Sequence, residues 1–209
     1  MKRIYFVRHG ESEGNAGAVF QPLDSSLTQK GREQAVIIAK RCADLPIEFM
    51  VSSTMNRAKQ TAEIIGKYIN KDIDYSDFFI ERCRPTEQIG LKRESPEALQ
   101  IEQTIIDNFS NPSFRYSDEE NFSDLNERAE KALNLLVNRK ESDILVVAHG
   151  LFLRVLMGRA IFRSDFTAKI CDSLFHSLVT NNSGLTLLEY DEEKKEWFMR
   201  VWNDHAHLG

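Results

Sequence analysis

Residues 3–10 read RIYFVRHG, an apolar run that passes abruptly into arginine, histidine and glycine. The first five of these residues have the length and composition of a buried strand. A second run, ILVVA at residues 144–148, is the most strand-like stretch in the chain and is followed by His149 and Gly150. The sequence therefore predicts two buried strands, each followed closely by a histidine and a glycine.

Strand patterns and helix patterns alternate along the rest of the chain. Two further short strands are predicted at residues 49–52 and 78–80, and a hairpin at 185–190 and 197–202. Helices are predicted at residues 29–43, 55–69 and 151–162, within 164–176, from Ser95-Pro96-Glu97 onward, and from a cap at Ser123. This alternation predicts an α/β fold, a three-layer α/β/α arrangement with a mostly parallel central sheet and helices on both faces.

The length of 209 residues suits a single domain spanning 1–209. The least regular stretch, residues 84–122, contains Pro85, Pro96 and Pro112 and several polar clusters. We expect it to be an excursion over one edge of the sheet, above the active site, and not a second domain.

Composition excludes several classes of protein. Hydrophobic residues make up 42% and charged residues 28%, which is ordinary globular usage and argues against disorder, collagen and coiled coil. The net charge of −5 argues against nucleic-acid and acidic-membrane partners, although a locally positive pocket could still take a small anion. No run approaches the roughly 18 apolar residues of a membrane helix.

The three cysteines, Cys42, Cys83 and Cys171, lie far apart and form no Cys-x-x-Cys pair. They predict neither a disulfide framework nor a zinc site, and they suit a reducing cytoplasm. We therefore expect a cytoplasmic location; the oligomeric state is left open.

Polar residues follow the ends of the predicted strands, where open α/β sheets bind ligands. The first predicted strand is followed by Arg8-His9-Gly10 and the third by Glu81. Arg57 lies in the first turn of the helix after Ser52-Ser53, and its side chain should point back toward the strand end. With His149 and Gly150, these positions place two imidazoles, two guanidiniums and one carboxyl group at one edge of the sheet.

This combination of side chains suits phosphoryl transfer. A neutral imidazole at His9 is a competent nucleophile, and like-charge repulsion from Arg8 and Arg57 would keep it unprotonated. The two guanidiniums would bind the non-bridging oxygens, so no metal and no cofactor is expected. Glu81 could protonate the leaving group, and the helix after Gly150 would direct free amides at the same anion.

These residues occur within a longer ordered pattern. Arg8-His9-Gly10-Glu11-Ser12, with Asn15 close behind, resembles the signature of the histidine phosphatase superfamily and its phosphoglycerate mutase-like fold. The other segments that match in order are Leu27-Thr28 with Gly31 and Gln34-Ala35, Ser52-Ser53 with Arg57-Ala58 and Gln60-Thr61-Ala62, Ile80-Glu81, Val147-Ala148-His149-Gly150, and Leu188-Glu189-Tyr190-Asp191.

The resemblance implies a role for each matching residue. His9 would be phosphorylated, and Glu81 would protonate the leaving group. The phosphoryl-binding residues would be Arg8, Asn15, Arg57 and His149, with Gly150 beside them. Water would then hydrolyse the phosphohistidine, and the partner would be a small phosphorylated substrate whose identity the sequence does not give.

Departures from the pattern favour a phosphatase over a mutase. Cofactor-dependent mutases carry a tryptophan where this chain has Gly14, and they carry an extra segment after the second arginine motif. The stretch after Glu81 matches only loosely, so Glu87 is the alternative proton donor. A phosphoglycerate-type mutase and a non-catalytic binder of phosphorylated ligands are the alternative functions.

Four basic residues in the excursion or just before it allow two interpretations. They either help to bind an anionic substrate or form a solvated face. These residues are Arg82, Arg84, Lys92 and Arg93.

Overall fold

The computed structural model describes residues 1–22 and 24–209, and its centre is a six-stranded sheet. The strand order is β3-β2-β4-β1-β5-β6. The first four strands of that order are parallel; β5 pairs antiparallel with β1, and β6 pairs antiparallel with β5 at the edge. The strands are β1 (Lys2–Arg8), β2 (Phe49–Ser52), β3 (Asp74–Tyr75), β4 (Asp143–Ala148), β5 (Leu185–Asp191) and β6 (Glu196–Asp204).

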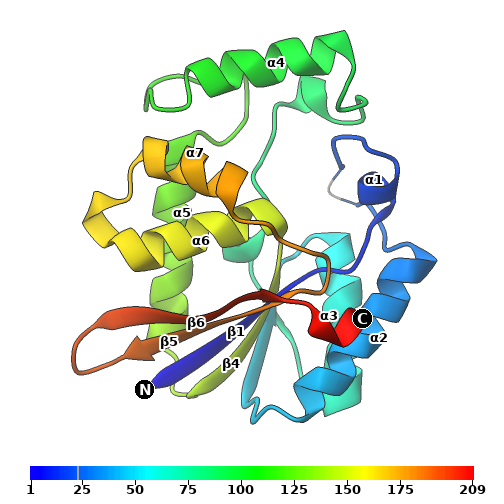
Figure 1. Cartoon of the computed structure of the whole chain (residues 1–209), viewed down its shortest axis with the longest axis vertical. Helices are drawn as coiled ribbons and strands as arrows, with labels where there is room; N and C mark the ends of the chain where they lie inside the picture. Colours follow the sequence, from blue (N-terminus) through cyan, green and yellow to red (C-terminus); the bar gives the residue numbers. More distant parts are fainter. Residues whose placement is uncertain (23) are drawn as a thin grey trace.

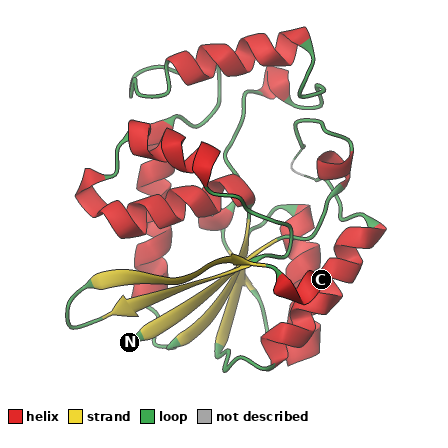
Figure 2. Ribbon diagram, in the orientation of Figure 1, coloured by secondary structure: helices red, strands yellow, loops and turns green. Residues whose placement is uncertain are grey.

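Helices cover both faces of the sheet, as Figures 1 and 2 show. One face packs against α2 (Gln29–Ala43) and α3 (Asn56–Ile69), and the other against α5 (Phe122–Val137), α6 (Gly150–Phe162) and α7 (Ala168–Ser177). The predicted three-layer α/β/α fold with a mostly parallel sheet is confirmed. None of the helices in the described residues has the length and apolarity needed to cross a bilayer.

The apolar runs in β1 and β4 are explained by burial on both faces. Ile4 and Phe6 pack into the core under α5 and α6, whereas Tyr5 and Val7 pack into the core under α2 and α3. Successive side chains of a strand point to opposite faces, so a strand between two helical layers needs apolar residues at every position.

Two local predictions were wrong. Residues 78–80 are not a strand: the Ser76 side chain accepts a hydrogen bond from the Phe78 N–H and starts a 3-10 helix at Asp77–Phe79, and β3 lies just before it. The cap of α5 is Asn121 and not Ser123, because the Asn121 side chain accepts from the Asp124 N–H. A side chain that satisfies the first free amides decides where each element begins.

The excursion at 84–122 contains a 3-10 helix at Thr86–Gln88 and the helix α4 (Pro96–Asp107), which begins at Ser95-Pro96 as expected. In Figure 1, α4 lies at the end of the molecule farthest from the β5–β6 hairpin. Arg84 forms an ion pair with Glu102 of α4 at 2.5 Å, which holds the helix to the chain that follows Glu81.

The loop after β1 packs directly against the start of α2. A Cβ atom on Gly31 would lie 1.9 Å from the Glu11 carbonyl oxygen, and one on Gly10 would lie 2.3 Å from the Gly31 carbonyl oxygen. The loop that carries His9 can therefore take its position only because both residues are glycine.

We predict that Gly31→Ala lowers the free energy of unfolding by about 1–3 kcal/mol, the range typical of overpacked sites. In an ordinary helix a change from glycine to alanine raises the free energy of unfolding by up to about 1 kcal/mol. A decrease therefore distinguishes the crowded position of Gly31 from an ordinary helix position. Urea unfolding measures it, with Gly17→Ala as the control, since the nearest atom to its Cβ would lie 3.2 Å away. Unchanged or increased stability of Gly31→Ala would contradict the packing described above.

Candidate active site

Two imidazoles lie side by side at the carboxyl ends of neighbouring strands. The parallel register pairs Arg8 of β1 with Ala148 of β4, and the His9 N–H donates to the Ala148 carbonyl at 3.0 Å. The rings of His9 and His149 are consequently 5.0 Å apart, centre to centre, and both are buried. The structure thus brings together the two histidines that the sequence singled out.

The His9 ring is held in one orientation. Its Nδ1 lies 2.6 Å from the Gly10 carbonyl oxygen, so we assign the ring proton to Nδ1 and the lone pair to Nε2. Burial, and then the charges of Arg57 and Arg8, place the pKa of His9 well below its ordinary value. A neutral ring with its lone pair on Nε2 is the nucleophilic form.

Two guanidiniums lie beside this ring, and no carboxylate pairs with either of them among the described residues. Arg57, in the first turn of α3, donates from Nε to His9 Nε2 at 3.3 Å, and also contacts the Pro22 carbonyl. Arg8, at the end of β1, donates to the Thr180 carbonyl at 2.5 Å and leaves its buried Nε without a partner. Burial lowers the pKa of Arg8 to about 10. Both side chains are therefore available to bind an anion next to Nε2.

His149 has a different set of partners. Its Nε2 lies 2.7 Å from the Ser53 hydroxyl, which also accepts from the Met55 N–H at 3.2 Å. If the hydroxyl donates its own proton to Nε2, the ring proton of His149 is on Nδ1, which is buried and has no partner. Burial, and then the charge of Arg57, lower the pKa of His149 as well. This arrangement gives the site one more unused N–H donor.

Glu81 lies at the start of α6. Its carboxylate accepts from the N–H groups of Leu151 at 3.2 Å, Phe152 at 2.9 Å and Arg82 at 3.0 Å. We expected the first amides of this helix to face the phosphate; two of them bind Glu81 instead. Negative charge is favourable at a helix N-terminus, which explains the position of the carboxylate.

A salt bridge behind the site supports the Glu81 segment. Arg128 of α5 donates to the Ile80 carbonyl at 2.8 Å and pairs with Glu120 at 2.7 Å. Glu87, the alternative proton donor, is exposed, accepts from the Ser117 hydroxyl and does not line the cavity. Of the two carboxylates, Glu81 is the one beside the histidines and arginines.

Asn15 is oriented by hydrogen bonds to its side-chain oxygen. That oxygen accepts from the Ser12 N–H and from the Asn182 amide, each at 3.3 Å. The Asn182 amide also donates to the His9 carbonyl at 2.9 Å. Because these donors occupy the side-chain oxygen, the amide nitrogen of Asn15 is left to bind an anion. Asn15 lines the cavity described next.

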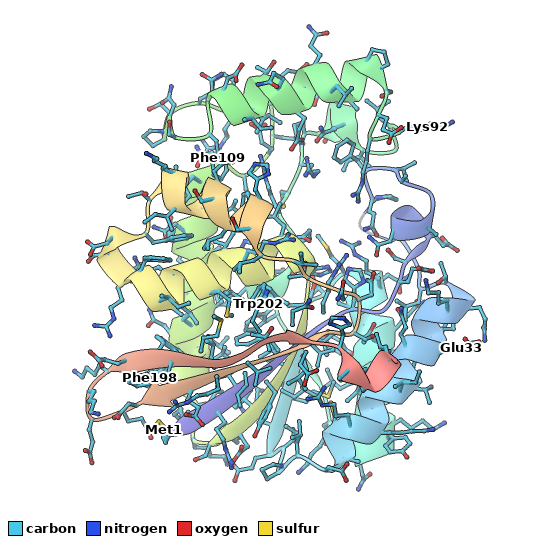
Figure 3. The ribbon with its side chains drawn as sticks, viewed as in Figure 1. Met1, Glu33, Lys92, Phe109, Phe198 and Trp202 are labelled. Carbon is cyan, nitrogen blue, oxygen red and sulfur yellow. The ribbon has the colours of Figure 1, made fainter. Side chains whose placement is uncertain are left out.

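These groups surround one cavity of about 660 Å³. Arg8, His9, Asn15, Arg57, Glu81 and Gly150 line it, and His149 lies behind His9. The lining contains two carboxylates, those of Glu81 and Asp118, and six arginines, Arg8, Arg57, Arg82, Arg84, Arg93 and Arg154. The cavity is thus strongly positive inside a protein of net charge −5. Lys92, by contrast, points outward at the edge of the molecule, as Figure 3 shows.

Sequence reasoning missed three contributors to the site. Arg154 lies one helical turn after Gly150, a spacing that could have placed it on the same face of α6. Asn182 and Thr180 precede β5, and no local pattern links them to residues 8 and 9. Their contacts depend on the antiparallel pairing of β1 with β5.

The burial of a neutral His9 predicts how stability depends on pH. In the unfolded chain the imidazole binds a proton below about pH 6.5, whereas in the folded chain it remains neutral to lower pH. The unfolded state then binds more protons, so the free energy of unfolding falls as the pH drops. Each such histidine contributes up to about 1.4 kcal/mol per pH unit.

We therefore expect the wild type to lose stability faster than His9→Asn between pH 6.5 and 5. The difference between the two unfolding free energies should change by up to about 1.4 kcal/mol per pH unit. Urea titrations at several pH values measure this, with the exposed His176→Asn as the control. Parallel curves for wild type and His9→Asn would show that His9 titrates normally.

Comparison with known proteins identifies relatives of this chain. A probable phosphoglycerate mutase GpmB of Salmonella arizonae is 28% identical over 218 residues, covering 100% of this chain and 95% of that protein. A protein of the same name from Erwinia tasmaniensis is 32% identical over 160 residues, covering 75% and 74%.

Solved structures show the same fold. YhfR of Bacillus stearothermophilus has a TM-score of 0.84 at 27% identity, covering 100% of both chains. A mycobacterial glucosyl-3-phosphoglycerate phosphatase has a TM-score of 0.80 at 21% identity, covering 97% of this chain and 99% of that one. The model of the family described as "Histidine phosphatase superfamily (branch 1)" matches residues 4–205. The chain therefore belongs to the histidine phosphatase superfamily.

Proposed function

We propose that this protein is a phosphomonoester hydrolase that works through a phosphohistidine at His9. The observation that supports this most strongly is the neutral Nε2 of His9, buried beside Arg57 and Arg8, whose guanidiniums have no acid partner among the described residues. A nucleophile surrounded by unpaired cations suits attack on an anionic phosphorus centre.

The proposed reaction has two steps. First, the lone pair of His9 Nε2 forms a bond to phosphorus and the phosphorus–oxygen ester bond breaks. Glu81, which takes up a proton when the phosphate dianion binds beside it, gives that proton to the leaving oxygen. Then water attacks the phosphohistidine, Glu81 takes a proton from that water, and the nitrogen–phosphorus bond breaks to release inorganic phosphate. Arg8, Arg57, Asn15 and the Nδ1–H of His149 bind the non-bridging oxygens in both steps.

We predict turnover of 4-nitrophenyl phosphate that an excess of chelator leaves unchanged, because the guanidiniums supply the positive charge. His9→Ala should lower kcat by at least about 10³-fold, and His176→Ala should not change it. Alkaline quenching after mixing with a ³²P-labelled ester should trap label on His9. Loss of activity with chelator, or full activity in His9→Ala, would rule out the proposed mechanism.

A phosphoglycerate-type mutase is the second candidate, because the curated relatives quoted above are named probable phosphoglycerate mutases. At position 14, where such mutases carry tryptophan, a Cβ on Gly14 would lie 2.1 Å from the Gln21 side chain. A tryptophan therefore cannot fit without moving Gln21. Conversion between phosphoglycerate isomers that requires a bisphosphate primer and outpaces phosphate release would favour the mutase.

Phosphate binding without any labelled histidine would favour a third function, a non-catalytic binder of phosphorylated ligands.

The contacts of Asn182 predict an effect on the same reaction. Asn182→Ala removes the donor that holds the Asn15 oxygen and the His9 carbonyl. We expect kcat/KM for 4-nitrophenyl phosphate to fall about tenfold, equivalent to about 1.4 kcal/mol for the lost hydrogen bonds. Asn181→Ala is the matched control, because the contacts of Asn181 described in the structure come from its backbone. Equal kcat/KM values for the two variants would show that the Asn182 side chain does not contribute to the reaction.

A further inference from the structure

Arg82 is a buried cation that forms no ion pair with any residue the structure describes. The residue is 7% exposed, and among the described residues its Nε and Nη2 atoms have no hydrogen-bond partner. The guanidinium lies 5.5 Å from the centre of the Phe109 ring, and the residue lines the cavity. An unpaired buried charge is strongly unfavourable, so this position indicates a site for an anionic ligand.

Two more arginines that line the same cavity contact one aromatic ring; with Arg82 they form the arginine wall of the cavity. Arg84 lies 4.5 Å and Arg93 lies 5.8 Å from the centre of the Phe20 ring. Arg84 pairs with Glu102, whereas the Arg93 side chain donates only to the Val19 carbonyl in the structure described. Stacking on the ring fixes these cations in place before any ligand binds.

Nearby carboxylates do not neutralise this wall. Glu119 accepts from the N–H groups of Tyr116 and Ser117, and Asp118 accepts from Thr86. Glu102 is thus the one acid paired with the three arginines in the described residues. Burial, and then the charge of Arg84, lower the pKa values of both Arg82 and Arg93, so Arg84 repels each of the other two guanidiniums.

Glu81 relates this wall to the phosphoryl site. Burial lowers the pKa of Arg8, Arg57 and Arg93, and the negative charge of Glu81 opposes that shift in all three. The carboxylate therefore lies within electrostatic reach of both groups of arginines. If the leaving oxygen meets Glu81, the rest of the leaving group extends toward the wall that carries Arg93.

We propose that Arg82, Arg84 and Arg93 form a second anion-binding subsite, and that the preferred substrate is a phosphomonoester whose leaving group carries its own carboxylate or second phosphate. This inference rests on the proposed hydrolase function and specifies its substrate class. It also explains why the cavity contains more arginines than one phosphoryl group needs.

The test compares esters that differ only in the far end of the leaving group. The three compounds are 3-hydroxypropyl phosphate, 2-carboxyethyl phosphate and propane-1,3-diyl bisphosphate, with a second series of six-carbon homologues. We expect kcat/KM for an anionic member of at least one series to exceed that of its neutral counterpart by at least tenfold, the effect of a charge-assisted hydrogen bond. Whichever anionic ester has the higher kcat/KM shows whether the subsite prefers a carboxylate or a second phosphate.

Variants assign the preference to the subsite. Arg82→Gln and Arg93→Gln should each lower the ratio of anionic to neutral kcat/KM by at least fivefold. Arg93 is exposed, so its variant tests the subsite even if Arg82→Gln does not fold. Arg200→Gln, on the β5–β6 hairpin and paired with Glu189, is the matched control and should keep the wild-type ratio.

Failure of the subsite and failure of the hydrolase function give different results. Turnover with equal kcat/KM for neutral and anionic members of both series would overturn the subsite and leave the hydrolase intact. If no ester is turned over, calorimetric titration with the same compounds decides: tighter binding of the anionic members, lost in Arg93→Gln, supports the subsite, and equal binding overturns it.

Discussion

The parallel pairing of β1 with β4 is the constraint on which the rest of the site depends. It ends both strands at the same level, with Arg8 opposite Ala148, and so places His9 and His149 in contact. A shift of register by one residue would turn every side chain of a strand to the other face. Because both faces are packed against helices, the core fixes the register, and the register fixes the distance between the two imidazoles.

The charges around this pair follow a single principle. Burial and two guanidiniums favour the neutral form of His9, and the same guanidiniums favour an anion next to it. Buried guanidiniums without an acid partner lower the stability of the folded protein. They lie where the anionic group of a phosphorylated ligand would pair with them. Among the residues that the structure describes, Glu81 is the carboxylate beside the two histidines, and the first amides of α6 hold it there. The excess of arginine continues along residues 82–93, which makes the cavity more positive than one phosphate requires.

The sequence predicted the parts of this arrangement that depend on short-range patterns. Apolar runs identified β1 and β4, and the residues directly after them proved to be the neighbours at the sheet edge. Elements decided by a single side-chain hydrogen bond were misplaced. Ser76 caps a 3-10 helix at residues 77–79, and Asn121 caps α5 two residues before the predicted cap Ser123. Contacts between distant segments, such as Asn182 with His9, have no local signal, and the use of the α6 amides by Glu81 depends on a loop geometry that composition does not encode.

The position of β1 at the centre of the sheet has a consequence for biosynthesis. This strand is synthesised before both of its partners, β4 and β5, which begin at Asp143 and Leu185. Until the ribosome has delivered residues 143–191, an apolar segment with unsatisfied backbone groups on both sides remains without its native neighbours. Such segments associate readily with other chains. Synthesis in this order therefore leaves β1 unpaired, and open to such association, until β4 and β5 have been made.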